Sequence, residues 1–394
     1  MQFTELFYKN PYTREFDSRV VSSTPDKEGF RLVLEDTAFY PEGGGQPSDT
    51  GVLVVGEESL PVLDVRREED DTVTHLVSKD LPKGTTVHGI IDWEKRFSLM
   101  QNHTGEHIVS GLVNRRFGYE NVGFHMGDVV TIDFSGEFSP EEAEEIEIAA
   151  NRVVWQDLPV NTLFPEEKEL PSFDYRSKKE LSGKVRLISI DNADLCACCG
   201  LHVERTGEIG LIKILSLIRY KGGVRLEMVS GDKALADYEN KLKSVTRIKN
   251  LLSVKPEEVD AAFDRVMRES AEKDEKIGRI NRRYIELKTK TLEPEDGIII
   301  DVEEDMNNIE IRKLCDALNK SGKAKVSLVL TPDEAASGVF RYCMASNSPD
   351  LKELAPELNK ALNGKGGGSK EMIQGSFAAS LQEITDLIRK KILR

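Results

Sequence analysis

The sequence has little of what builds extracellular or membrane proteins. It holds only five cysteines, an odd number: Cys196, Cys198, Cys199, Cys315 and Cys343. The first three of these lie within four residues. A disulfide framework is therefore a poor interpretation, and a reduced chain with a metal or thiol site is a better one. No apolar run approaches the roughly 18 residues of a membrane span. The N-terminus has no basic start followed by an apolar run, so no signal peptide is predicted and we expect a cytoplasmic protein.

Positive charge is outnumbered, because 54 Lys and Arg stand against 69 Asp and Glu and the net charge is −15 at pH 7. This balance argues for solubility and against a general nucleic-acid coat protein, although a local basic groove is compatible with it. Apolar residues make up 39 % and charged residues 31 % of the 394 residues. That is enough apolar material for a sizeable core, and the length suits two or three domains.

Residues 1–92 are predicted to be β-rich. Short runs with β-branched residues alternate with turn segments such as Pro-Asp and Gly-Gly-Gly: RVVSS, FRLVLEDTAFY, GVLVVG, LPVLDVRR and TVTHLVS. We expect a small N-terminal β-barrel there.

Residues 93–235 are predicted to form a mixed α/β domain. From Trp93 onward apolar residues recur at spacings of three and four, which indicates a helix. A second helix is predicted after Ser139, whose side chain suits a cap and is followed by Pro and two Glu. Strands are expected at 185–190 and within 209–230.

Residues 236–292 are highly charged and helical, with an apolar stripe at Ile277, Ile280, Tyr284 and Leu287 that breaks upstream. We expect a helical arm rather than a firm coiled coil. Residues 293–394 then read as strand, helix and strand, followed by a Gly-rich loop, GKGGGSKE, and a final helix, LQEITDLIRKKIL. The predicted fold class is α+β multidomain, with a second α/β domain at the C-terminus.

Two short pairs of residues have the spacing of metal ligands. His103 and His107 lie four apart on the predicted helix and so face the same way, which suits two imidazoles on one ion. Cys198 and His202 share that spacing, and thiolate plus imidazole suits zinc. Each pair alone is more often an ordinary buried or surface pair. Because the chain has only six histidines, the two pairs together favour a zinc site.

The ligand assignment leaves alternatives open. Cys199 lies three residues from His202, and Cys196 with Cys199 forms a C-x2-C pair that suits a zinc knuckle or a redox pair. We prefer Cys198, because it keeps the spacing of four. A site with one cysteine and three histidines is usually closed and structural, whereas a catalytic zinc keeps a position for water.

Around these residues the chain resembles the editing domain shared by alanyl-tRNA synthetase and the free-standing AlaX-type editing proteins. The resemblance lies in HTGEH and CCGLH, about ninety residues apart, and in TGEIG at 206–210. Upstream, AFYPEGGGQP followed by Asp49 and Gly51 resembles the Gly-rich motif of the longer AlaX forms. Downstream, GVRLEMVSG resembles the closing strand of the editing domain, and GGGSKEMIQGSFA resembles the loop of a DHHA1-type domain. The synthetase's aminoacylation and tRNA-recognition regions have no counterpart.

This resemblance implies a long-form, free-standing editing hydrolase. Its implied reaction is ATP-independent deacylation in trans of mischarged tRNA(Ala), chiefly Ser-tRNA(Ala), with Gly-tRNA(Ala) as the second candidate substrate. It implies one Zn²⁺ per chain, tRNA(Ala) as partner, and a homodimer formed through the C-terminal DHHA1-like domain. The catalytic residues and metal ligands that carry over are His103, His107, Cys198 and His202.

The substrate-binding residues are assigned from the chemistry of their side chains and from their positions within or near these motifs. Those we expect to contact the amino acid or the tRNA end are Thr104, His125, Gly43, Gly44, Gly45, Gln46, Arg219 and Arg225. For His125 the alternative is a satisfied core histidine, for Thr104 a cap of its own helix, for the glycine run a β-barrel turn, and for the arginines a solvated face. Lys95, Arg96, Arg115 and Arg116 flank the metal helix and are further candidates for tRNA contact.

Glu106 stands between the two histidines, where the synthetase has Thr. We interpret it as a helix-surface carboxylate, with a general base as the alternative. Two other function classes remain: a tRNA-binding module whose zinc is purely structural, and a zinc hydrolase acting on a small ester or amide.

Overall fold

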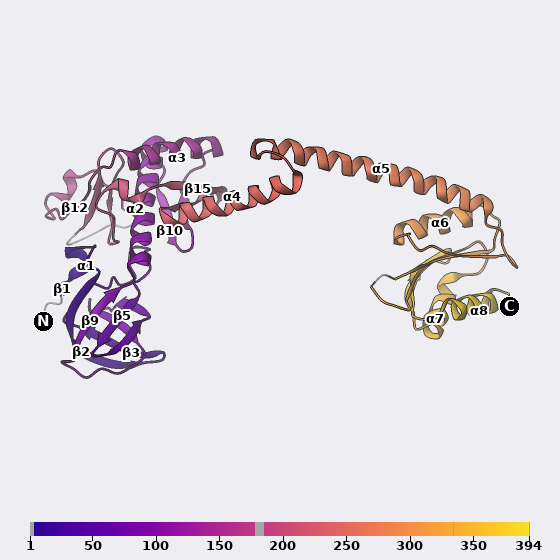
Figure 1. Ribbon diagram of the computed structural model, residues 1–394, viewed down its shortest axis with the longest axis horizontal. Coiled ribbons are helices and arrows are strands. Elements are labelled where there is room, and N and C mark those ends of the chain that lie inside the picture. The colour runs from indigo at the N-terminus through magenta and orange to yellow at the C-terminus, as the bar shows by residue number, and fades with distance from the viewer. Residues whose placement is uncertain (1–3, 178–184, 334, 394) are drawn as a thin grey trace. The chain divides into compact units, whose positions relative to one another are not determined.

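A computed structural model of the chain describes residues 4–177, 185–333 and 335–393. The chain folds into two compact units, Met1–Arg247 and Ile248–Arg394, which are described separately (Figure 1). No helix in these described ranges is long and apolar enough to cross a membrane. The molecule is a multidomain α+β protein, as the sequence predicts.

A seven-stranded antiparallel sheet begins the first unit, in the order β6-β5-β9-β2-β3-β8-β7. Its strands are β2 (Glu15–Asp26), β3 (Gly29–Leu34), β5 (Gly51–Val55), β6 (Glu58–Val62), β7 (Asp64–Arg67), β8 (Val73–Val77) and β9 (Thr86–Ile91). Along β2 the side chains of Phe16, Ser18 and Val20 are buried and those between them are exposed, so one face of the sheet covers a core. The predicted β-rich region is confirmed, whereas its closure into a barrel stays a prediction.

Small elements border this sheet. The short strands β1 (Thr4–Glu5) and β4 (Asp36–Thr37) pair in parallel, and α1 (Leu6–Lys9) follows β1. Between β4 and β5 the chain makes a tight turn in which Gly43 and Gln46 exchange two backbone hydrogen bonds. This turn is the Gly-rich motif.

The helix α2 (Trp93–Phe117) is the centre of the first unit. Asp92 caps its start by accepting the Lys95 N–H, and Gly118 ends it with a left-handed backbone at φ 72°. The residues from Ser98 to Gly111 are all buried. Figure 1 shows why: α2 runs from the N-terminal sheet into the layer that carries β10, β12 and β15. Polar side chains on this helix must therefore find their partners inside the protein.

Two further sheets and a helix surround α2. The first is antiparallel, in the order β10-β11-β16-β15, from β10 (Asn121–Met126), β11 (Val130–Phe134), β15 (Ile212–Tyr220) and β16 (Gly223–Ser230). The second is β12 (Val160–Leu163), β13 (Leu187–Ile190) and β14 (Asp194–Ala197), with short 3₁₀ turns at Leu170–Ser172 and Thr206–Ile209. The predicted cap is confirmed, because Ser139 and Glu142 form a capping box at the start of α3 (Pro140–Trp155).

The second unit starts within α4 (Asp232–Leu252) and continues through a 3₁₀ turn (Pro256–Glu258) and α5 (Val259–Thr291). Its sheet has the order β17-β18-β19-β21-β20, from β17 (Ile298–Val302), β18 (Val326–Pro332), β19 (Phe340–Ser346), β20 (Lys365–Gly368) and β21 (Met372–Phe377). The helices are α6 (Asn308–Lys320), α7 (Leu351–Ala361) and α8 (Leu381–Ile392). On α5 the predicted stripe leaves Ile277, Ile280 and Leu287 more than half exposed.

The Gly-rich segment of the second unit is a strand, not the predicted loop. Lys365–Gly368 pairs with β21 as the edge strand β20. A Cβ on Gly366 would lie 2.6 Å from the carbonyl oxygen of Gln374, and one on Gly375 would lie 2.0 Å from that of Lys365. The glycines are therefore needed for close backbone approach rather than for a flexible turn.

Candidate metal centre and substrate cavity

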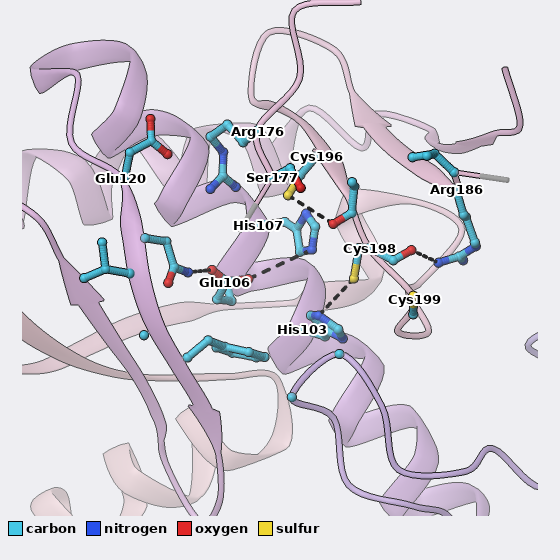
Figure 2. A pocket seen from close by; sticks show the side chains of 18 residues that line it. His103, Glu106, His107, Glu120, Arg176, Ser177, Arg186, Cys196, Cys198 and Cys199 are labelled. Atoms are coloured by element: carbon cyan, nitrogen blue, oxygen red, sulfur yellow. Dashed lines mark hydrogen bonds and ion pairs between the residues drawn. The ribbon is translucent and has the colours of Figure 1, made fainter. Parts of the chain in front are cut away.

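The structure brings the two ligand-spaced pairs together. The rings of His103 and His107, one turn apart on α2, have centroids 5.3 Å apart, and the His202 ring lies 4.5 and 4.6 Å from them. The Sγ of Cys198 lies 3.4 Å from the Nε2 of His103. One ligand atom of each of the four side chains lies within 4.8 Å of the others. This cluster can hold a metal ion, and Figure 2 shows its members His103, His107 and Cys198.

Cys198 and His202 lie beyond the end of β14 in a segment that forms no helix. Their spacing of four therefore does not place them on one face of a helix. The segment is fixed instead by Arg186, whose Nη1 donates to the carbonyls of Cys198 and Gly200 at 2.9 and 2.7 Å. A Cβ on Gly200 would lie 2.0 Å from Cε1 of His103, so only glycine fits here.

Each histidine is oriented through its Nδ1 atom. His103 Nδ1 lies 3.0 Å from the side-chain oxygen of Gln46, and that oxygen also accepts the Leu201 N–H at 2.9 Å, which fixes the Gln46 amide orientation. His107 Nδ1 lies 2.8 Å from Oδ2 of Asp194, and His202 Nδ1 lies 3.2 Å from the Thr104 hydroxyl. All three rings therefore turn Nε2 to the cluster, as metal-binding histidines do.

The charges in the cluster also suit a cation. Burial raises the pKa of the Cys198 thiol, but His103 and His107 lower it more, and the pKa lies well below its ordinary value. The thiolate is the form that binds metal. Burial and the charge of His103 hold the pKa of His202 well below its ordinary value, so this ring is neutral. Its buried Nε2 has no hydrogen-bond partner among the described residues, and a metal ion there would satisfy it.

The neighbouring cysteines differ from Cys198. Cys196 lies in β14, and burial raises the pKa of its thiol to about 11. Cys199 is an exposed residue overall. Partial burial of its thiol and the charge of the nearby Cys198 raise the pKa of that thiol as well. Neither therefore offers a ready thiolate beside the three imidazoles.

Arg176 contacts the carboxylate of Asp194, which orients His107. Its guanidinium donates to both carboxylate oxygens of Asp194 at 2.7 and 2.9 Å, and the same carboxylate accepts the His107 Nδ1–H. The charges of His107 and Arg176 keep the pKa of Asp194 below its ordinary value, although burial opposes this. The sequence carried no signal for Arg176 or Arg186, because their partners are 12 to 18 residues away in a region without a motif.

A cavity of about 530 Å³ opens beside the cluster. Its lining residues include Gly44, Gly45, His103, Glu106, His107, Asn121, Phe124, Arg176, Arg186, Cys196, Cys198 and Cys199. The Phe124 ring stacks on His103 at 5.4 Å between centroids. A Cβ on Gly45 would lie 2.4 Å from that phenyl ring, so the Gly-rich turn forms one edge of the cavity.

Glu106 is not on the surface, and our interpretation of it as a helix-surface carboxylate was wrong. Its exposed fraction is 4 %, because α2 is covered on both sides. Oε1 accepts the Ser110 hydroxyl and the Asn121 amide N–H, each at 2.6 Å, and Oε2 lies 4.0 Å from His107 Nε2. Figure 2 shows Glu106 beside His107.

Other candidate residues lie away from the cavity. Thr104 is fully buried and donates to the Met100 carbonyl of its own helix at 2.8 Å. His125 is an exposed residue of β10, so its core alternative was wrong. Arg225 forms a two-pronged ion pair with Asp133, and Arg219 is largely exposed near Glu137.

The basic residues that flank α2 divide into two kinds. Arg96 is fully buried and bonded to Asp49, so its expected role in tRNA contact was wrong. Lys95 donates to the Ser48 carbonyl, Arg115 to that of Asn192, and Arg116 pairs with Glu145 on the surface.

Replacing Gln46 tests its role in orienting His103. Gln46→Leu keeps the volume but removes the oxygen that accepts the His103 Nδ1–H, so we expect metal affinity to fall roughly 10- to 100-fold. Competition with a chelator measures this, and Gln156→Leu at an exposed position is the matched control. An affinity that stays equal to that of the control would contradict the assigned role.

Comparison with known proteins gives three family models. Residues 9–95 match tRNA synthetases class II (A), residues 185–249 match the second additional domain of threonyl and alanyl tRNA synthetases, and residues 295–393 match the DHHA1 domain. The candidate metal ligands Cys198 and His202 fall within the second match. The order of the matches is the one that the motifs predicted.

Individual relatives cover nearly the whole chain. The alanyl-tRNA editing protein AlaX-L of Pyrococcus horikoshii is 28 % identical over 98 % of this chain and 98 % of its own length. The alanine–tRNA ligases of Pyrococcus furiosus and Thermococcus kodakarensis are each 32 % identical over 94 % and 98 % of this chain. This chain spans only 42 % and 43 % of those ligases. The resemblance predicted from the motifs is confirmed.

Proposed function

We propose that the chain, which is similar along 98 % of its length to the AlaX-L alanyl-tRNA editing protein, is an aminoacyl-tRNA deacylase. Its substrate is mischarged tRNA(Ala), chiefly Ser-tRNA(Ala), with Gly-tRNA(Ala) second. The observation that carries the proposal is the convergence of three imidazoles and the Cys198 sulfur, with His103, His107 and Cys198 lining a cavity. That donor set suits Zn²⁺, one per chain.

The proposed reaction cleaves the ester between an aminoacyl group and a terminal ribose hydroxyl. His103, His107, Cys198 and His202 would hold a zinc ion, which would supply Lewis acidity for polarising a carbonyl or lowering the pKa of water. The protein's own residues orient this centre: Gln46, Asp194 and Thr104 each fix one imidazole. Correct orientation of the ligands is what keeps such a site ready for its substrate.

The cavity wall would receive the tRNA end. Gly44 and Gly45 let the backbone approach closely, since neither carries a side chain into the space that they line. The Phe124 ring offers a flat apolar surface, and bases stack on such rings. Arg186, whose printed bonds are to backbone carbonyls, lines the same cavity and would add positive charge where a phosphate backbone enters.

The untested assignments remain proposals. We propose the four segments 1–92, 93–235, 236–292 and 293–394 as domains, and a homodimer formed through the last of them. We also keep His125, Arg219 and Arg225 as proposed tRNA contacts at the outer surface of the first unit, although Arg225 would first have to leave Asp133. Sedimentation of the purified chain at two concentrations tests the dimer.

One observation favours a second function. Four protein ligands fill a tetrahedral shell, as in structural zinc sites, and the chain would then be a tRNA-binding module. The two proposals differ in what the metal does for the fold, and ligand variants separate them.

The deacylation assay tests the first proposal directly. We expect purified, zinc-loaded protein to hydrolyse Ser-tRNA(Ala) roughly 100-fold or more faster than Ala-tRNA(Ala), because a site that hydrogen-bonds a hydroxyl rejects the analogue without it. Gly-tRNA(Ala) gives the third rate, and a small seryl ester without tRNA is the control. Equal rates on Ser- and Ala-tRNA(Ala), or full activity on the small ester, would overturn the proposal.

A further inference from the structure

A polar wall beside the metal cluster is built from Glu106, Ser110 and Asn121. Glu106 and Ser110 lie one turn apart on α2, and Asn121 is the first residue of β10. The Ser110 hydroxyl donates to Oε1 of Glu106, and the Asn121 amide donates to the same oxygen and to the Ser110 oxygen, the latter at 3.3 Å. These three bonds use every donor that the two neutral side chains have.

The wall also contains hydrogen-bond acceptors to which no described residue donates. Oδ1 of Asn121 is buried and has no hydrogen-bond partner among the described residues. The second carboxylate oxygen of Glu106 lies 4.0 Å from His107 Nε2, on the side of the cluster. Both residues line the cavity, and Asn121 is only 6 % exposed. An acceptor that is buried without a partner costs free energy, so a ligand with donors would be stabilised there.

The charges nearby narrow the kind of ligand. The guanidinium of Arg176, which lines the same cavity, is bonded to both oxygens of Asp194 rather than to Glu106. The hydrogen bonds that the described residues give to the Glu106 carboxylate come from the neutral side chains of Ser110 and Asn121, and the nearby basic group is His107, whose Nε2 lies 4.0 Å from Oε2. A buried carboxylate of this kind is best matched by a cation that donates hydrogen bonds. An ammonium group has three donors and no acceptor, which complements a wall that offers acceptors alone.

We infer that Glu106 and Asn121 form a receptor for the α-ammonium group of the aminoacyl ester. The inference rests on the proposed function and names the part of the substrate that the wall holds. An α-amino group has a pKa of about 7.7 to 8.0 in model peptides, so at pH 7 most carry a charge. The ester carbon is two bonds from that nitrogen, and holding the nitrogen beside His107 places the ester at the metal cluster. Glu106 is then a substrate-binding residue.

The receptor predicts that the protein distinguishes esters with a free amine from esters with a blocked or missing amine, whatever the amino-acid side chain. An aminoacyl ester whose amine is replaced or blocked loses the charge that Glu106 pairs with. The protein should therefore act on free aminoacyl-tRNA and spare tRNA that carries a peptide or another N-acyl group.

A deaminated substrate tests the inference, because it lacks the ammonium group but does not carry the extra atoms of an N-acyl group. Nitrous acid converts Ser-tRNA(Ala) to its hydroxy-acid ester, in which a neutral hydroxyl stands where the ammonium was. We expect the wild-type protein, at pH 7, to hydrolyse the free-amine ester roughly 10- to 100-fold faster than the hydroxy ester, after subtraction of the uncatalysed rates, because a charge-assisted hydrogen bond is lost. Glu106→Gln should lower the rate on the free-amine ester by a similar factor and change the rate on the hydroxy ester by less than about 3-fold.

The outcomes are distinct. An equal loss on both esters in Glu106→Gln would overturn the receptor and indicate a general base. A wild-type ratio near one would overturn it also, even if the variant fails to fold. Glu303→Gln removes another buried carboxylate, bonded to Lys288 in the second unit, and should leave the ratio unchanged. If zinc-loaded wild-type protein hydrolyses neither ester, the proposed function itself fails. Zinc content of each variant separates loss of metal from loss of the receptor.

Discussion

Replacing His107 by alanine is expected to lower the deacylation of Ser-tRNA(Ala) roughly 1000-fold or more, which corresponds to about 4 kcal/mol of transition-state stabilisation. The ring contributes one of the four converging ligand atoms and is held by Asp194. Its loss also leaves a cavity beside Asp194 and removes that carboxylate's partner. We expect zinc content to fall with activity. Deacylation rate, zinc content and a thermal melt of the same preparation are the measurements.

The melt decides between the two proposed functions. A folded, zinc-poor and inactive variant supports the hydrolase, whereas a variant that unfolds when zinc is lost supports a structural metal. Cys198→Ala gives the same comparison from the other ligand pair. His88→Ala is the matched control, because His88 lies half-exposed in the N-terminal sheet beside Asp17. A His107→Ala protein with full zinc content and full activity would contradict both proposals.

Replacing Arg96 by methionine is expected to have the largest effect on stability. Arg96 and Asp49 are 0 % and 1 % exposed. Arg96 Nε donates to both oxygens of Asp49 at 2.8 and 2.9 Å, and its two terminal nitrogens donate to the carbonyls of Pro11 and Ala38. The variant leaves the Asp49 carboxylate buried without its counter-charge. We expect the free energy of unfolding to fall by about 3 to 5 kcal/mol, measured by urea denaturation.

Removing both charges is the informative control. Replacing a buried ion pair by apolar residues is often neutral, whereas breaking it is costly. The double variant Arg96→Met with Asp49→Leu should therefore recover roughly half or more of the lost stability. A single variant that loses less than about 1 kcal/mol, the ordinary size of a mutational effect, would show that the pair does not join α2 to the N-terminal sheet.

The sequence predicted the parts of this molecule that depend on local pattern. The 3.6-residue period after Trp93 predicted α2, and Ser139 with the acidic residues after it predicted α3. The two ligand pairs could be found because each is only five residues long and histidine is rare in this chain. Local pattern could also suggest a β-rich N-terminal region, since its strands carry alternating buried side chains.

Features that depend on tertiary contacts were not predictable. From the sequence Glu106 looks like a surface residue, but both sides of α2 are covered in the folded chain. Arg96 looks like a tRNA contact, but it pairs with Asp49, which lies 47 residues away in the sequence. Cys198 joins the cluster through a non-helical segment fixed by Arg186. In each case the deciding partner lies on another element, and no periodicity within one element reports it.

The amide oxygen of Gln46 has a consequence for how the protein matures. That single atom accepts one hydrogen bond from α2, through His103, and another from the backbone of Leu201, residues that lie 57 and 155 positions further along the chain. Three distant stretches must thus be in place together, and pairings of such high sequence separation are slow to form in folding. A nascent chain that has been synthesised only as far as α2 already has two of the histidines but cannot yet have the fully oriented centre. The four candidate ligands can therefore come together only after the chain has been synthesised as far as His202.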